Sequence, residues 1–455
     1  MIAESVEAPA ARAPETLEES SNMTTIGRRE FESLWTALSG IGRDPVRGGY
    51  SRHTFDDADL QMREWFAAEA AARGLDVETD RNGNIWAWWV SPGPARGVPA
   101  GEASGAAAGV LPGGGAIVTG SHLDSVPGGG AFDGPLGVVS ALLAIDELRA
   151  RGVAPARPLA VVCFAEEEGG RFGLPCLGSR LLAGATDLDA ARALTDRSGV
   201  TLAEAARRAG VDPAHFGPDP DRLRRIGAFV ELHVEQGRLM HAADSRAAVG
   251  IASGIVAHGR WRITITGEGN HAGTTAIADR RDPMVVAAHA MLTARAAATE
   301  RDGAVATVGR IEPIPGGTNV IASQVRMWLD TRYGATEDTD AAVDSIVARI
   351  RQHAANEGCT VEVQRESASP EVRFDAGLRD RLAAVVPGPI VPTGAGHDAG
   401  VLAAHLPTAM LFVRNPTGIS HAPGEFAEID DCVAGVGALA DALGTLVVAN
   451  DPVSN

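Results

Sequence analysis

The chain has 455 residues, more than the roughly 250–300 at which a single hydrophobic core stops growing, so we expect two domains. Its 58 acidic and 40 basic residues give a formal net charge of −18, which excludes nucleic acid and anionic membrane surfaces as main partners. All 40 basic residues are arginines. Schiff-base chemistry on a lysine and the lysine-containing phosphate loop are therefore excluded as well.

The four cysteines are widely scattered and form no CxxC pair, so neither a disulfide framework nor a thiolate zinc site is indicated. Residues 1–25 lack the apolar core of a signal peptide, and no later stretch of about 18 strongly apolar residues occurs. We expect a disordered tail over residues 1–25 and a cytoplasmic protein.

The first half of the chain reads as alternating strands and helices. Apolar residues at helical spacing predict a helix over 54–73, with Thr54 and Asp57 as its capping pair. The other predicted elements are strands 75–79 and 84–90, a flexible Gly/Ala/Pro-rich loop 91–115, strand 116–119, helix 135–150 and strands 159–165 and 228–233. The strand–helix–strand succession predicts an α/β domain with parallel strands.

A different order follows from about residue 250. Strand 260–267, helix 282–300, strands 304–311 and 319–331, helix 337–356 and strand 360–365 give a β-α-β-β-α-β order, which is typical of a ferredoxin-like fold. Helix and strand alternate again from 376 to 450, with a buried strand over 409–413. The fold class is thus α/β: a domain of a mixed sheet flanked by helices, over 26–249 and 366–455, with an α+β domain inserted at 250–365.

Chemistry-bearing residues follow several of these strands. His122 and Asp124 follow strand 116–119, Asp133 lies between glycines at the start of a helix, and Glu166, Glu167 and Glu168 directly follow strand 159–165. The ends of parallel strands are where open α/β sheets place their ligand sites. Each piece also has an ordinary interpretation, as a solvated loop, a tight turn or a charged surface turn.

Two further pieces complete the set. Glu231, His233 and Glu235 alternate on one face of strand 228–233 and its continuation, and His421 lies in the loop after strand 409–413. Together these imidazoles and carboxylates form a nitrogen and oxygen ligand set without sulfur, which favours one or two divalent ions such as Zn, Mn, Co or Ni. A serine-hydrolase alternative is disfavoured because no GxSxG elbow occurs.

The ordered motifs identify a family. The motifs GSHLDS, FDGPLG, EEEG, ELHVEQG, NHAGTT, GTNVI, GHDAG and ISHAPGE, in this order, resemble the carbamoylase branch of the M20 metallopeptidase superfamily. The resemblance covers nearly all of residues 31–446. This branch includes N-carbamoyl-L-amino-acid hydrolases, allantoate amidohydrolases and β-ureidopropionases. The resemblance implies two divalent metal ions per subunit, with His122 and His233 on one ion, Glu168 and His421 on the other, and Asp133 bridging them.

The same resemblance implies the remaining roles. Glu167 would be the general base and Asp124 would hold His122 in the correct tautomer. The inserted domain would act as a lid and a homodimer interface, with His271 contributed in trans from the neighbouring subunit to stabilise the developing oxyanion. The implied substrate-binding residues are Gln236, Asn319, Arg332, Gly396 and His397; from the residues alone, Arg332 could equally be a surface charge and Asn319 a turn residue.

The resemblance therefore predicts an amidohydrolase that cleaves the ureido C–N bond of N-carbamoyl-L-amino acids. Allantoate is the alternative substrate, and aminoacylase or peptidase activity is a more distant one. A catalytically silent binding homologue would have lost Glu167 or a ligand, yet all six positions are present. A purely structural metal protein would need a closed site with cysteine ligands, and the candidate ligand set contains no cysteine.

Overall fold

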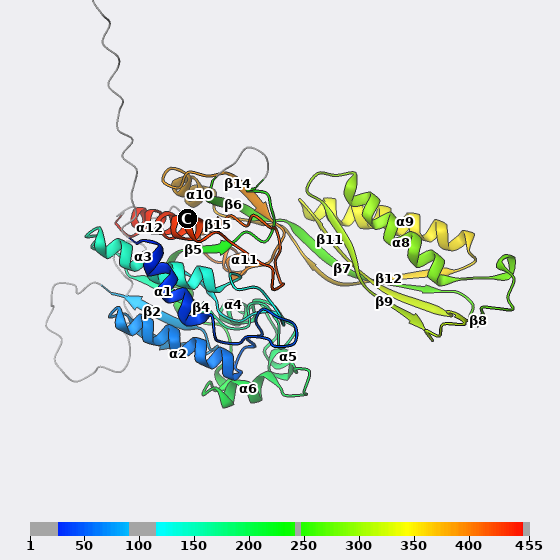
Figure 1. Cartoon of the computed structure of the whole chain (residues 1–455), viewed down its shortest axis with the longest axis horizontal. Helices are drawn as coiled ribbons and strands as arrows, with labels where there is room; N and C mark the ends of the chain where they lie inside the picture. The colour runs from blue at the N-terminus through cyan, green and yellow to red at the C-terminus, as the bar shows by residue number, and fades with distance from the viewer. Residues whose placement is uncertain (1–25, 91–114, 242–246, 449–455) are drawn as a thin grey trace, which may run out of the picture.

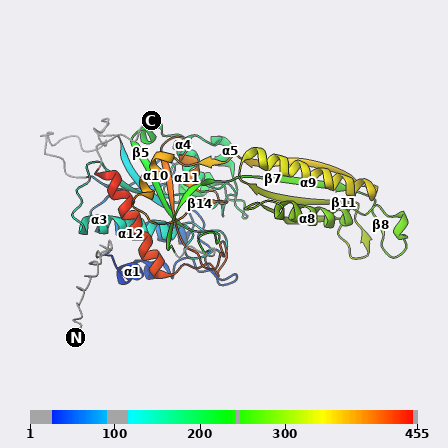
Figure 2. The same cartoon turned by 90° about the horizontal axis from the view of Figure 1, so that it is seen from above.

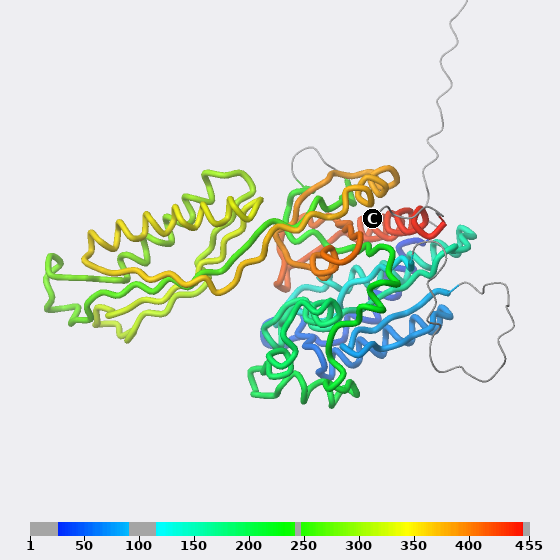
Figure 3. The backbone as a smooth tube through the Cα atoms, turned by 180° about the vertical axis from the view of Figure 1, so that it is seen from behind, coloured from blue at the N-terminus to red at the C-terminus, as the bar shows by residue number. Residues whose placement is uncertain are grey.

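The computed structural model describes residues 26–90, 115–241 and 247–448. It consists of a large body and a smaller, elongated one that are joined by extended chain segments (Figure 1). The smaller body is formed by an inner part of the chain, which leaves and re-enters the larger body side by side (Figure 3). The tail 1–25 and nearly all of the loop 91–115 lie outside the described residues. No helix in the described ranges has the length and apolarity needed to cross a bilayer.

The large domain is built on a nine-stranded mixed sheet in the order β1-β2-β4-β3-β5-β15-β6-β13, with β14 also paired to β6. Its central strands β4, β3, β5 and β15 are parallel neighbours, whereas β2 and β6 run antiparallel to theirs. The strands are β1 (Asp76–Thr79), β2 (Ile85–Trp89), β3 (Ala116–His122), β4 (Leu159–Phe164), β5 (Ile226–Val234), β6 (Val249–Ile255), β13 (Val372–Arg373), β14 (Ile390–Thr393) and β15 (Thr408–Val413).

Helices cover both faces of this sheet. Along β4, Leu159, Val161 and Cys163 pack into one core cluster while Ala160, Val162 and Phe164 pack into the other, which explains its uninterrupted apolar sequence. The first face is covered by α1 (Arg28–Leu38), α2 (Asp57–Ala72), α3 (Pro135–Ala150), α10 (Ala376–Ala383) and α12 (Ile429–Val447), and the second by α4 (Leu177–Ala183), α7 (Pro220–Arg224) and α11 (Asp398–Leu402). A satellite core holds α5 (Leu188–Ala193), α6 (Leu202–Arg208) and the short helix η1 (Pro213–His215).

The small domain, residues 257–369, has an antiparallel sheet in the order β12-β7-β11-β9. Two long helices cover one face of that sheet (Figures 1 and 2). This is the predicted ferredoxin-like arrangement. Its elements are β7 (Ala257–Thr266), β8 (Asn270–His271), η2 (Ile277–Asp279), α8 (Pro283–Thr299), β9 (Val305–Ile314), β10 (Val320–Ile321), β11 (Gln324–Tyr333), α9 (Thr336–Asn356) and β12 (Thr360–Ser369).

Three predicted boundaries differ from the structure. The N-cap of α2 is Asp56, whose side chain accepts a hydrogen bond from the amide of Asp59, whereas Thr54 accepts one from the amide of Glu166. The predicted strand 319–331 is two strands, because β10 pairs with β8 and only β11 enters the four-stranded sheet. The expected domain boundary at 250 falls inside β6, which belongs to the large sheet, so the chain enters the small domain a few residues later.

Candidate metal and active site

The site lies where the parallel strands of the large sheet end. His122 is the last residue of β3, Glu167 and Glu168 follow β4, His233 lies near the end of β5, and His421 follows β15. These four strands are adjacent and parallel, so their carboxyl ends share one edge of the sheet. The predicted ligands are therefore brought together by the sheet itself.

One group of possible ligands is buried. His122, Asp133 and His233 each offer a ligand atom, and these atoms lie within 4.8 Å of one another. Asp133 Oδ1 is 3.4 Å from His122 Nε2 and 3.3 Å from His233 Nε2. Gly134 makes this close approach possible: its φ is +83°, and a Cβ there would lie 2.4 Å from the His122 ring.

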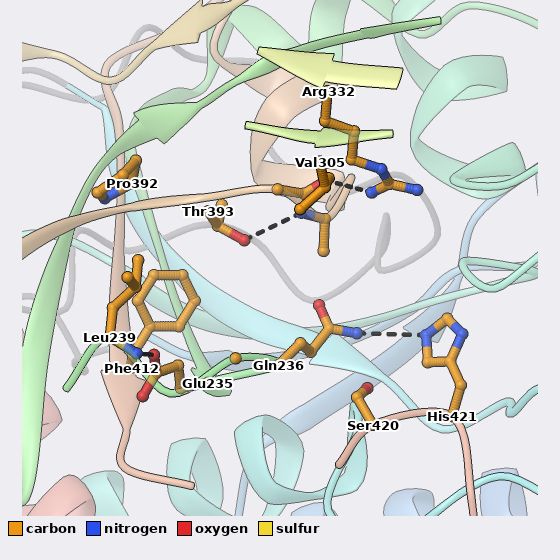
Figure 4. A pocket seen from close by; sticks show the side chains of 13 residues that line it. Glu235, Gln236, Leu239, Val305, Arg332, Pro392, Thr393, Phe412, Ser420 and His421 are labelled. Atoms are coloured by element: carbon orange, nitrogen blue, oxygen red, sulfur yellow. Dashed lines mark hydrogen bonds between the residues drawn. The ribbon is translucent and has the colours of Figure 1, made fainter. Parts of the chain in front are cut away.

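A second group shares Asp133 and is more open. His421 Nε2 lies 3.5 Å from Asp133 Oδ2 and 3.4 Å from Glu168 Oε2, and its side chain is 50% exposed. Gln236 Nε2 donates to Asp133 Oδ2 at 2.7 Å and lies 3.3 Å from His421 Nε2 (Figure 4). His421 has a φ of +57°, a costly conformation for a non-glycine residue and one that is concentrated at functional sites.

The hydrogen bonding of the two buried histidines fits a cation. His122 Nδ1 and His233 Nδ1 lie 3.0 and 2.9 Å from the backbone carbonyl oxygens of Asp124 and Val234, so the proton belongs on Nδ1 and the lone pair on Nε2. Both Nε2 atoms are buried without a hydrogen-bond partner. Two lone pairs facing one carboxylate repel it unless a cation or protons lie between them, and histidines oriented by carbonyls are typical of metal ligands.

The shifted pKa values of His122 and Asp133 also fit a bound cation. Burial by itself lowers the pKa of His122, but the charges of Glu167, Asp133 and Asp124 outweigh it and hold the pKa well above its ordinary value. Burial raises the pKa of Asp133, yet His233 and His122 hold it well below the usual range. The His122 imidazole thus favours its protonated form while the Asp133 carboxylate stays ionised, so a positive charge is favoured at the place where a divalent ion would otherwise balance the carboxylates.

Glu167 is buried against the first group. Its Oε2 lies 3.5 Å from His122 Nε2, and its Oε1 lies 3.4 Å from the thiol of Cys176, which donates to it. Burial, together with the charges of Asp398, Glu168 and Asp124, raises the pKa of Glu167 well above its ordinary value despite His122. A buried carboxylate with a raised pKa beside a potential metal position has the properties of a general base.

The expected role of Asp124 needs a correction. The structure places its backbone carbonyl, not its carboxylate, in hydrogen-bond contact with His122 Nδ1; the carboxylate is 3.7 Å away. The carboxylate instead accepts the amides of Glu167 and Glu168, at 3.2 and 3.1 Å. Asp124 therefore stabilises the turn that carries these two glutamates, because each of its carboxylate oxygens accepts one of their backbone amides.

Two further carboxylates support the site: Glu425, to which the residue pattern assigned no role, and Glu231, which it placed among the candidate ligands. Glu425 Oε1 accepts the amides of Phe132 and Asp133 at 2.8 and 2.9 Å, and so holds the Asp133 loop in place. Glu231 accepts from the Ser121 hydroxyl at 2.8 Å and from the Ala399 amide at 3.2 Å, beneath the histidines. Glu425 was missed because it is nearly 300 residues from Asp133 in the chain.

A cavity of about 420 Å³ adjoins the second ligand group, between the two domains (Figure 4). Gln236 and Arg332 line it as expected, but His397 and Gly396 do not; Gly394 and Ala395 take their place. His397 is 2% exposed and its ring packs 4.6 Å from that of His233. The reason is local: α11 begins immediately after His397, which turns its side chain toward the sheet.

Arg332 and Asn319 lie at opposite ends of the small domain. Arg332, near the end of β11, reaches the large domain, where its Nη1 donates to the carbonyl of Gly394 and its Nε donates to Asp330 at 3.0 Å. Asn319 precedes β10 and contacts the loop of His271 through Ala272, at the tip farthest from the large sheet (Figure 1). At ~3.3 Å per residue, β11 alone separates them by roughly 25 Å or more.

The sequence and the structure were compared with known proteins. Residues 118–445 match the model of peptidase family M20/M25/M40. The chain is 34% identical over 412 residues to an N-carbamoyl-L-amino acid amidohydrolase of Geobacillus stearothermophilus, covering 89% of this chain and 95% of the relative. It is 31% identical to an allantoate amidohydrolase of Escherichia coli strain K12, covering 92% and 98%. A solved amidase of the hydantoinase/carbamoylase family from Burkholderia multivorans superposes with a TM-score of 0.80 at 29% identity, covering 94% and 99%.

Proposed function

Since this chain belongs to peptidase family M20/M25/M40, we propose that it is a two-metal amidohydrolase that converts N-carbamoyl-L-amino acids to amino acids, carbon dioxide and ammonia. The observation that carries the proposal is the pair of ligand groups that share Asp133. Similarity to an N-carbamoyl-L-amino acid amidohydrolase supports the substrate class. Similarity to an allantoate amidohydrolase keeps allantoate as the second candidate.

His122, His233 and Asp133 would hold one divalent ion, and Glu168, His421 and Asp133 the other. Nitrogen and oxygen donors of this kind suit Zn, Mn, Co or Ni. Such ions, when bound, lower the pKa of a water molecule and polarise the carbonyl of the substrate.

Glu167 acts as the general base. It accepts the proton of the attacking water and passes it to the leaving nitrogen. The thiol of Cys176 donates to one carboxylate oxygen, and this leaves the oxygen that faces His122 for the water. The backbone at Glu167 is anchored by the Asp124 carboxylate, which keeps the base in one place.

Arg332 binds the carboxylate of the substrate. Two of its nitrogens donate to Gly394 and Asp330, and these contacts aim the rest of the planar guanidinium at the cavity. A guanidinium pairs with a carboxylate through two parallel hydrogen bonds. Gln236 lies between this cavity and Asp133, so its amide is placed to contact the ureido group.

His271 and Asn319 act on the site of a second copy of the chain, in a homodimer. Both are exposed at the tip of the small domain, and neither reaches the cavity of its own chain. The outer face of α8 carries exposed apolar side chains, among them Met284 at 40% and Leu292 at 65% exposure, as a subunit interface requires. His271 then donates to the developing oxyanion from the partner chain.

We expect the protein to work in the cytoplasm, where its four unpaired cysteines stay reduced. The proposal is tested by loading the full chain with Zn, Mn, Co or Ni and measuring ammonia and amine release from N-carbamoyl-L-amino acids, allantoate and N-acetyl amino acids. Release from N-carbamoyl-L-amino acids supports it, and a preference for allantoate selects the second candidate. Release from N-acetyl amino acids alone, or from none of the panel, contradicts it.

A further inference from the structure

The cavity beside the ligand groups has two chemically different ends. His421, Gln236 and Ser420 line the end toward Asp133, whereas Leu239, Pro392 and Phe412 gather at the other end (Figure 4). Val305 of β9, which pairs with Arg332, adds apolar lining to the same cavity from the small domain. Leu239 and Val305 are 52% and 51% exposed, so apolar surface from both domains is available to a bound ligand.

The polar groups at the apolar end are already bonded within the protein. The carboxylate of Glu235 accepts the amides of Leu239 and Met240, and Glu235 is 5% exposed. The Thr393 hydroxyl accepts the amide of Ala395 at 3.1 Å (Figure 4). The described residues at this end therefore offer no unpaired charge to a ligand. A charged or ureido-bearing group placed there would lose its hydrogen bonds to water and gain few from the protein.

We propose that the apolar part of this cavity, formed by Leu239, Pro392 and Phe412 with Val305 across from them, binds the substrate side chain, and that the preferred substrates carry apolar side chains. The inference rests on the proposed function. With the carboxylate on Arg332 and the ureido group beside Gln236 and His421, the group on Cα faces the apolar wall. Allantoate carries a second ureido group there, and N-carbamoyl-β-alanine has no side chain to fill it.

The first test is a substrate series on the metal-loaded full chain. N-carbamoyl derivatives of L-alanine, L-2-aminobutyrate, L-norvaline and L-norleucine differ by one methylene at each step. Burial of a methylene is commonly worth about fourfold, so kcat/KM should rise by about 60-fold over the three steps. N-carbamoyl-L-glutamine and N-carbamoyl-L-ornithine, similar in length to norleucine but polar or charged, should fall below norleucine, as should allantoate.

The second test assigns the residues. Leu239→Asn keeps the approximate size of the side chain and removes its apolar surface. The 60-fold range of kcat/KM between the alanine and norleucine substrates should therefore shrink to less than about tenfold. Val305→Thr, which is nearly isosteric, should shrink it by a smaller amount from the opposite wall. Val448→Asn is the matched control, because Val448 has the same 52% exposure and lies at the end of α12, outside the cavity. It should leave the span unchanged.

The outcomes separate the two proposals. A flat series, or a preference for glutamine, ornithine or allantoate, overturns the apolar side-chain site, while ureido hydrolysis itself still stands. A steep series that is unaltered in both Leu239→Asn and Val305→Thr also overturns it, because the preference then comes from elsewhere. Absence of ammonia release from every compound overturns the proposed function, and the side-chain site with it.

Discussion

At the edge of the large sheet His122 and His233 are 0% and 1% exposed, and every ligand candidate there contacts another. At the tip of the small domain His271 and Asn319 are exposed, and their hydrogen bonds are to residues of that tip, such as Gly273 for the His271 ring and Ala272 for the Asn319 carbonyl. The first region is assembled by its own chain, because parallel strands deliver its residues to one edge. The second lies outside the cavity of its own chain, and only the proposed homodimer would give it a site to act on.

The largest expected effect tests the self-contained region. Glu167→Gln should retain both metals and lose about 10²–10⁴-fold or more in kcat, because an amide accepts no proton. Metal analysis and single-turnover assays measure this. Glu166→Gln is the control: the Glu166 carboxylate accepts the amides of Arg171 and Phe172, and burial raises its pKa to about 8, so a neutral amide should change little. Activity near that of the native protein in metal-replete Glu167→Gln contradicts the assignment.

The next effect tests whether the tip acts on the other chain. His271→Ala should lower the rate by about 10²–10³-fold, the usual effect of removing an oxyanion donor. Mixing it with Glu167→Gln under subunit exchange should restore one intact site per heterodimer, and Asn319→Ala should behave like His271→Ala. Arg332→Ala is the control, because Arg332 contacts Gly394 of its own chain. Its mixture with Glu167→Gln should remain inactive. Failure of His271→Ala to recover shows action within one chain.

A smaller effect is expected where the two domains meet. Arg332→Lys should raise KM by about 10–100-fold, because the point charge of an ammonium cannot form both parallel hydrogen bonds to a carboxylate. Steady-state kinetics with N-carbamoyl amino acids measures the change. N-carbamoyl amines, which lack the carboxylate, should be poor substrates and indifferent to the substitution; an equal loss for both classes means that Arg332 is structural.

The smallest expected effect is on thermal stability, and it compares the contributions of the two ligand groups to metal binding. A metal that binds only the folded protein should stabilise it by about 2.7 kcal/mol at 100 times its Kd, which raises Tm. Thermal unfolding with and without a chelator measures this. His233→Ala should remove more of the rise than His421→Ala, since His233 is buried and His421 is half exposed. His215→Ala, at a residue 76% exposed outside the site, should retain it. Equal losses in all three variants contradict the ligand assignment.

The parts of the fold that were predicted from the residues follow short-range rules. Strand, helix and their order came from apolar periodicity, and the ferredoxin-like order of the small domain is confirmed by its sheet. The clustering of His122, His233 and His421 also followed, because the carboxyl ends of neighbouring parallel strands meet at one edge. Two predictions were wrong: Thr54 does not cap α2, and the strand 319–331 is interrupted before β11. In both cases a contact with a segment distant in the sequence decides, since Thr54 bonds to Glu166 and β10 pairs with β8.

The residue pattern predicted the α/β fold class from local periodicity and placed the ligand candidates where strands end, and the ordered motifs indicated the family. Only the folded chain shows that Asn319 and Arg332 lie at opposite ends of β11, that His397 is buried beneath His233, and that Leu239 and Val305 face one cavity. These facts depend on the length and position of a strand and on the direction in which a side chain points. Packing between segments far apart in the sequence determines both.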